Sequence, residues 1–160
     1  MHTAAMDWLA RYRTNDRVTV LDIGGRNING SPRTLFPNAE YTVLDILDGP
    51  GVDIVADAAT WSPRKTYDVV ICAEVFEHTD VWPAICRTAF DAVRGVFIAT
   101  MAGPGRAPHS AIDGGLLRDG EYYSNIRPET LREVLVSCGF SDINVDQTGD
   151  DVRAVGSREV

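Results

Sequence analysis

The chain of 160 residues contains only three cysteines and no long apolar run. Cys72, Cys86 and Cys138 are widely spaced and odd in number, which excludes a disulfide scaffold and a CxxC metal site and favours a reducing compartment. No apolar stretch approaches the ~20 residues of a membrane span, and the first residues lack the basic and apolar segments of a signal peptide. The sequence therefore predicts a cytoplasmic protein that does not bind a membrane.

Basic residues are also in the minority. Fifteen Lys and Arg stand against 23 Asp and Glu, which gives a net charge of −8. A field of that sign opposes phosphate backbones and anionic lipid, so nucleic acid is a disfavoured partner. No repeat, low-complexity tract or charge block marks a linker. We expect residues 1–160 to form a single domain with enough chain to bury one core.

Apolar runs alternate with amphipathic or mixed segments along the chain. Runs of the buried-strand type are predicted at residues 18–23, 41–45, 52–55, 67–72, 95–100, 140–145 and 152–155. Helices are predicted over the first dozen residues, over 81–93 and from Pro128 to Cys138, where Gly139 suits a C-terminal cap. This order favours an α/β domain with a compact, doubly wound, mostly parallel sheet and helices on both faces. Because the segments between the second, third and fourth strands are short, we expect some crossover helices to be trimmed.

The longest segment without a periodic pattern covers residues 101–127. It contains five glycines and two prolines. A loop of that length in a small domain is usually functional, and this one follows a predicted strand end, where open α/β sheets hold their ligands. Tyr122 and Tyr123 within it are candidates for lining a pocket.

Glycines and carboxylates follow the first three predicted strands. Gly24-Gly25 comes directly after the first strand, where backbone N–H groups can approach a ligand that a Cβ would exclude. Asp45 ends the second strand, where doubly wound nucleoside binders place a carboxylate for the ribose hydroxyls. Asp57 follows the third, where it can accept from an adenine amine while Trp61 packs on the base. The pattern indicates a nucleoside site. A plain Gly-Gly turn, followed by solvated carboxylates that only cap the strand ends, would give the same sequence pattern.

The ordered motifs resemble those of the class I S-adenosylmethionine-dependent methyltransferases over nearly the whole chain. The resemblance rests on Leu21–Gly25, Leu44–Ile46, Val55–Ala58, Asp68–His78 and Val136–Phe140. The fourth of these has the form with a Glu-Val-x-Glu-His signature. The resemblance implies a Rossmann-like sheet of seven strands with the last antiparallel. It also implies S-adenosylmethionine as the methyl donor, lying across the ends of the first, second and fourth strands.

The resemblance also implies roles for individual residues. The expected donor-binding residues are Asp22, Gly24, Gly25, Asp45, Asp57, Ala58, Cys72, Ala73 and Glu74. Asp45 would bind the ribose hydroxyls, Asp57 and the Ala58 backbone would read the adenine, and residues 72–74 would face the sulfonium. Arg26 and Ile28 depart from the glycine-richer loop of the family.

Glu74, Glu77 and His78 are spaced to share one helical face, which can place three ligands around one ion. Some relatives with this signature use these positions for a divalent metal, and His109 could add a fourth ligand. In many other relatives the signature caps a helix and shapes the pocket, and we expect no metal here. His78, His109 and Glu74 are the candidates for a catalytic base.

We expect methyl transfer from S-adenosylmethionine to a small-molecule acceptor. The alternative is a catalytically silent donor-binding module or a partner subunit of an active enzyme. A nicotinamide oxidoreductase would carry GxGxxG after the first strand, which the sequence lacks. Only the first helix and residues 101–127 remain for acceptor recognition. A second copy of the chain, in a homodimer, is the other candidate for this role.

Overall fold

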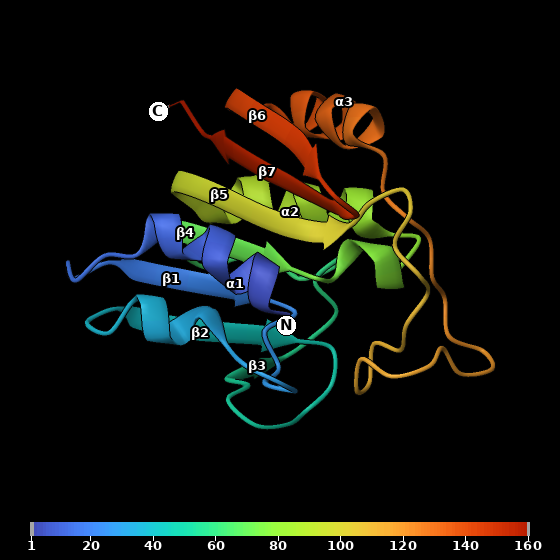
Figure 1. Ribbon diagram of the computed structural model, residues 1–160. Helices are drawn as coiled ribbons and strands as arrows, with labels where there is room; N and C mark the ends of the chain where they lie inside the picture. Colours follow the sequence, from blue (N-terminus) through green and yellow to red (C-terminus); the bar gives the residue numbers. More distant parts are fainter. Residues whose placement is uncertain (1, 160) are drawn as a thin grey trace.

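One seven-stranded sheet forms the centre of the computed structural model, which describes residues 2–159 (Figure 1). Its strands are β1 (Thr19–Ile23), β2 (Glu40–Asp45), β3 (Ile54–Val55), β4 (Tyr67–Ala73), β5 (Val93–Ala102), β6 (Ser141–Thr148) and β7 (Asp151–Ser157). They lie in the order β3-β2-β1-β4-β5-β7-β6. β7 is antiparallel to both its neighbours, whereas the pairs among β1 to β5 are parallel. The expected mostly parallel sheet with an antiparallel last strand is confirmed.

Helices cover both faces of this sheet, as expected. The elements are α1 (Thr3–Leu9), α2 (Trp82–Ala92), α3 (Pro128–Cys138) and the 3-10 turns η1 (Ala10–Tyr12), η2 (Pro32–Leu35) and η3 (Phe76–His78). α1 and η2 pack on one face, and α2 and α3 pack on the other (Figure 1). The connections from β2 to β3 and from β3 to β4 contain no helix, so the expected trimming of crossover helices is confirmed.

The alternation of side chains along β4 explains its unbroken apolar run. Val69 and Ile71 belong to the core beneath α1, whereas Val70 and Cys72 belong to the core beneath α2 and α3. Successive side chains of a strand point to opposite faces, so a strand covered on both sides needs apolar residues at every position. β4 is the central strand of the sheet, so its end lies at the middle of the sheet's carboxyl edge.

The bounds of β3, β5, β6 and β7 differ by two or more residues from the sequence prediction. β3 has only two residues, because the Asp53 carboxylate accepts the Val43 N–H at 2.8 Å and so replaces a backbone partner. β5 begins directly after α2 and extends to Ala102, beyond the predicted residues 95–100. Gly139, with φ +100°, ends α3 in the left-handed conformation that the sequence suggested.

The segment from residue 103 to residue 127 crosses the carboxyl edge of the sheet without regular structure (Figure 1). Backbone hydrogen bonds hold its returning end, from Ile126 N–H to the Ala102 carbonyl and from Ser124 N–H to the Glu77 carbonyl. The carboxyl ends of β1, β2 and β4 therefore share one edge with this loop. Among the described residues, no helix has the length and apolar character needed to cross a membrane.

Candidate functional site

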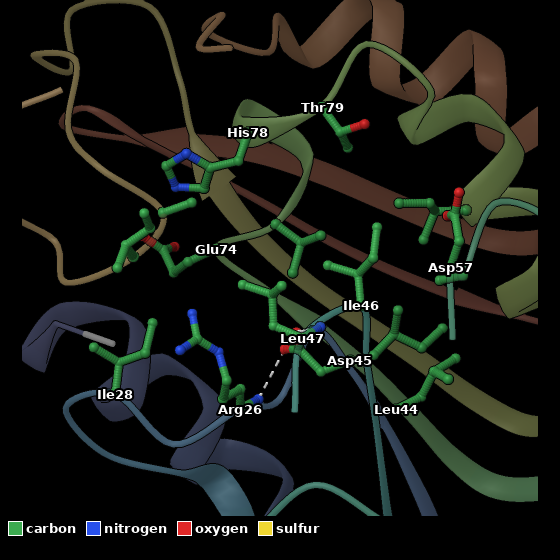
Figure 2. Close-up of a pocket in the computed structure, with 17 residues that line it drawn as sticks. Arg26, Ile28, Leu44, Asp45, Ile46, Leu47, Asp57, Glu74, His78 and Thr79 are labelled. Carbon is green, nitrogen blue, oxygen red and sulfur yellow. Dashed lines mark hydrogen bonds between the residues drawn. The ribbon is translucent and has the colours of Figure 1, made fainter. Parts of the chain in front are cut away.

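A cavity of about 300 Å³ opens at the carboxyl ends of β1, β2 and β4 (Figure 2). This volume is at the lower end of the range for small-molecule sites. Of the nine residues predicted to bind a donor, five line this first cavity, namely Gly24, Asp45, Asp57, Ala58 and Glu74. Residues separated by up to 50 positions thus converge on one space, as the ends of parallel strands require.

The two glycines after β1 are required by close packing. Gly24 has φ +73°, and a Cβ at this position would lie 2.3 Å from Val75 Cγ2. A Cβ on Gly25 would lie 2.4 Å from Cγ of Asp22. Gly25, Asp22 and Ala73 line a small recess of about 70 Å³ beside the first cavity, and Glu74 lines both. The glycines therefore let the loop fold tightly over the strand ends.

The carboxylates of Asp45 and Asp57 stand at the cavity wall and hold the local backbone. Asp45 accepts the N–H groups of Arg26, at 3.1 Å, and Leu47, at 2.9 Å. Asp57 accepts the Ala59 N–H at 2.9 Å. Each carboxylate oxygen has two lone pairs, so both groups can still accept from a ligand. Trp61 is absent from the cavity lining and packs against the main core instead, which does not fit the prediction that it stacks on a base.

Two other predicted donor residues lie behind the cavity. Cys72 is buried in the core beneath α2, and burial raises the pKa of its thiol. Its side chain therefore does not face the cavity that its neighbour Glu74 lines. Asp22 is also buried, and burial raises its pKa to about 7, although the hydrogen bond from Tyr41 acts in the opposite direction. The Asp22 carboxylate packs against Gly25 and so supports the glycine loop.

Glu74 follows directly after β4 and has a left-handed backbone conformation, with φ +59°. Its carboxylate accepts a hydrogen bond from the Thr100 hydroxyl at 3.0 Å and lies 3.4 Å from both the His2 ring and the Arg106 guanidinium. Burial raises the pKa of Glu74, but the interactions with His2, Arg106 and Thr100 outweigh it and leave the pKa lowered. Glu74 is thus held ionised where the strand meets the cavity.

The expectation that Glu74, Glu77 and His78 share one helical face is wrong. Glu74 precedes the 3-10 turn η3 and turns away into its ion pairs. Instead, Glu77, His78 and His109 bring one potential ligand atom each to within 4.8 Å of one another. Edge-on contacts of both histidine rings with Tyr123 hold this cluster against the long loop.

This cluster fits a metal only in part. Glu77 is fully buried, and its Oε2 atom has no hydrogen-bond partner among the described residues. Burial, reinforced by the charge of Glu74, raises the pKa of Glu77 to about 8. Burial and His109 lower the pKa of His78 to about 4. At neutral pH Glu77 and His78 are therefore both uncharged, and Glu74, the third residue of the signature, is paired elsewhere.

A second, more open cavity of about 730 Å³ adjoins the first and shares Ile28, Glu74, His78 and Ala111 with it. Its other lining residues include His2, Arg106 and His109. Neither His2 nor Arg106 belongs to a sequence motif, so neither was predicted to lie at the site. Arg106 connects the residue before α1 to the start of β7, since it pairs with Asp151 at 2.5 Å and contacts the His2 ring at 2.9 Å.

Comparison with known proteins agrees with this geometry. Residues 1–145 match the protein family described as "Methyltransferase domain". No curated protein sequence matches the chain significantly.

Similar solved structures share the fold. One is the complex of DhpI with SAH, at 23% identity and TM-score 0.72, covering 97% of this chain and 84% of that one. An S-adenosylmethionine-dependent methyltransferase from Mesorhizobium loti has 15% identity and TM-score 0.72, covering 98% of each chain. The Burkholderia thailandensis 1,6-didemethyltoxoflavin-N1-methyltransferase, with bound 1,6-didemethyltoxoflavin and S-adenosylhomocysteine, has 14% identity and TM-score 0.70 and covers 98% and 79%.

Proposed function

The chain belongs to the methyltransferase-domain family, and we propose that it transfers a methyl group from S-adenosylmethionine to a small-molecule acceptor. The observation that carries this proposal is the convergence of Gly24, Asp45, Asp57 and Glu74 on the first cavity. Two structurally similar proteins also support it, since one is described as S-adenosylmethionine-dependent and another contains S-adenosylhomocysteine.

The donor would lie along the first cavity. Asp57 and the Ala58 backbone would hold the adenine, against the apolar side chains of Leu44 and Ile85 that line the same space. Asp45 would accept from the ribose hydroxyls with the lone pairs that its backbone partners leave free. The amino-acid end would then point toward Glu74, where the first cavity meets the second.

The acceptor would occupy the second cavity. This space is large enough for a small molecule and is lined by polar side chains of the long loop, including Arg106, His109 and Ser110. The net charge of −8 disfavours nucleic acid as the acceptor. Because the two cavities share Glu74 and His78, the acceptor atom and the donor methyl group would meet between them.

In the proposed reaction, an acceptor oxygen or nitrogen forms a bond to the methyl carbon while the C–S bond breaks. The electron pair of that bond stays on sulfur, which neutralises the sulfonium and leaves S-adenosylhomocysteine. The protein contributes mainly proximity and alignment, since the leaving group is already activated. His78 is the best-placed base for the acceptor proton, because its lowered pKa keeps the imidazole neutral and it lines both cavities.

We further propose that the protein works in the cytoplasm, since its three cysteines are buried free thiols. The partner included in this proposal is a second copy of the chain, in a homodimer. The alternative function is a silent donor-binding module, which would keep the first cavity intact but lack turnover.

Calorimetric titration with S-adenosylmethionine and S-adenosylhomocysteine tests the donor site. We expect both to bind, and Asp45→Ala to weaken binding by about tenfold or more, as for a lost charge-assisted hydrogen bond. Asp48→Ala, in the exposed part of the same loop, is the matched control. Absence of binding at millimolar concentration would refute the proposal.

Turnover is tested with methyl-labelled donor and a fractionated metabolite extract, with mass-spectrometric identification of the labelled product. A labelled small molecule supports the enzyme. Donor binding without any product across all fractions would favour the silent module.

A further inference from the structure

We infer that Arg26 binds the carboxylate of the donor's amino-acid end and so selects the intact amino acid. This inference rests on the proposed donor in the first cavity and names the residue that reads one group of it. Arg26 lines that cavity and the adjoining recess, directly after the two glycines that follow β1.

The charge of Arg26 has no partner within the described chain. No carboxylate of residues 2–159 lies within ion-pair distance of its guanidinium, and its Nε atom is buried without a hydrogen bond. The nearby acids bind other groups of the chain. Asp45 accepts two backbone N–H groups, and Glu74 is engaged by Thr100, His2 and Arg106. A buried donor of this kind calls for an acceptor, and an anionic ligand group would supply it.

The surrounding loops hold the Arg26 side chain in place. Its backbone N–H donates to Asp45, and the next residue, Asn27, donates its N–H to the Pro50 carbonyl at 3.1 Å. The aliphatic stem lies over Gly49, where a Cβ would come within 2.7 Å of Arg26 Cδ. Figure 2 shows the guanidinium directed away from the Asp45 carboxylate, toward the side of the pocket drawn with Ile28 and Glu74.

The charges of the cavity match those of the donor. Arg26 is the one described lining residue with a permanent positive charge, since the lowered pKa of His78 leaves that ring neutral. Asp57, the proposed adenine-binding residue, stands on the other side of the pocket in Figure 2. A donor anchored there places its amino-acid end toward Arg26. A guanidinium pairs with a carboxylate through two parallel N–H···O bonds, which an ammonium cannot reproduce.

The test compares S-adenosylmethionine with its decarboxylated form, which keeps the adenosine, the sulfonium and the amino group. Calorimetry is done on the wild-type chain, Arg26→Met, Arg26→Lys and the control Arg64→Met, an exposed arginine outside the cavity. For Arg26→Met we expect Kd for S-adenosylmethionine to rise about 10- to 100-fold, while Kd for the decarboxylated form changes less than about threefold. Arg26→Lys should retain part of the preference, and Arg64→Met all of it.

Each outcome decides a different point. Equal losses for both ligands in Arg26→Met would assign Arg26 a structural role and overturn the inference, as would unchanged affinity for both. If the wild-type chain binds neither ligand, the donor proposal itself fails. Thermal melting of each variant accompanies the titrations. If Arg26→Met does not fold, Arg26→Lys decides: a reduced preference for S-adenosylmethionine over its decarboxylated form supports the inference, and an unchanged preference overturns it.

Discussion

The Tyr41 hydroxyl donates a 2.8 Å hydrogen bond to the carboxylate of Asp22, a side chain only 1% exposed. The two residues come from neighbouring parallel strands, β2 and β1. The same carboxylate packs against Gly25 and so supports the loop that lines the first cavity. This pair therefore couples the protonation of a buried acid to the shape of the proposed donor site.

Asp22→Asn should reduce the pH dependence of stability. In the unfolded chain an aspartate loses its proton near pH 4, whereas burial raises the pKa of Asp22 to about 7 in the folded protein. The folded state therefore holds one more proton between these values, and this contribution to stability is lost as pH rises from about 4 to 7. The slope of unfolding free energy in that window should become shallower by up to about 1.4 kcal/mol per pH unit in Asp22→Asn.

Urea unfolding at pH 5, 6, 7 and 8 measures this slope. Glu77, whose pKa is raised to about 8, contributes in the same direction in both proteins and cancels in the comparison. Parallel curves for the wild-type chain and Asp22→Asn would show that Asp22 does not titrate as described.

Gly25→Ala should destabilise the fold by about 1–3 kcal/mol, the usual range for overpacking. The new Cβ would lie 2.4 Å from Cγ of Asp22 and 2.5 Å from its Oδ2 atom, and the buried carboxylate has little room to move. The check is a double-mutant cycle by urea unfolding, because Asp22→Ala removes the obstructing atoms. Destabilisation in the double variant should be less than the sum of the two single variants. Strict additivity would contradict the contact.

His78→Gln should lower kcat by about 10²- to 10⁴-fold on the acceptor found with labelled donor, as expected for loss of a general base. Because the pKa of His78 is lowered to about 4, wild-type activity should persist through pH 5–6, where an ordinary histidine is largely protonated. The pH profile of kcat provides the measurement. The control is His109→Gln, which lines only the second of the two cavities and should act mainly on KM. Unchanged kcat in His78→Gln would exclude it as the base.

Metal removal should leave donor binding unchanged. The carboxyl of Glu77 has a pKa raised to about 8 and is therefore protonated at neutral pH, and a protonated carboxyl is a poor ligand for a divalent cation. The measurement is Kd for S-adenosylhomocysteine before and after treatment with excess EDTA, which should agree within about twofold. A large loss that added Zn²⁺ or Mg²⁺ restores would instead assign a metal to Glu77, His78 and His109.

Much of the fold follows from local sequence patterns. Apolar residues at every position from Val69 to Ala73 indicate a strand buried on both faces, and Gly139 marks the end of α3. The placement of Asp45 and Asp57 was also predictable, because the carboxyl ends of parallel strands meet at one edge of a sheet. The alternation of side chains in β4 also places Cys72 in the core, as expected of a small buried apolar residue.

The tertiary structure alone decided the electrostatics of the site. The contact between His2 and Arg106 spans 104 positions, and Glu74 gains its ionised state from that pair. No periodic pattern records such contacts, since they join residues that are far apart in the sequence. Glu74 does not share the predicted helical face, because it precedes η3 and its backbone turns at φ +59°. The sequence thus determined which chemical groups follow each strand at the carboxyl edge of the sheet. Packing determined which of these groups carry charge.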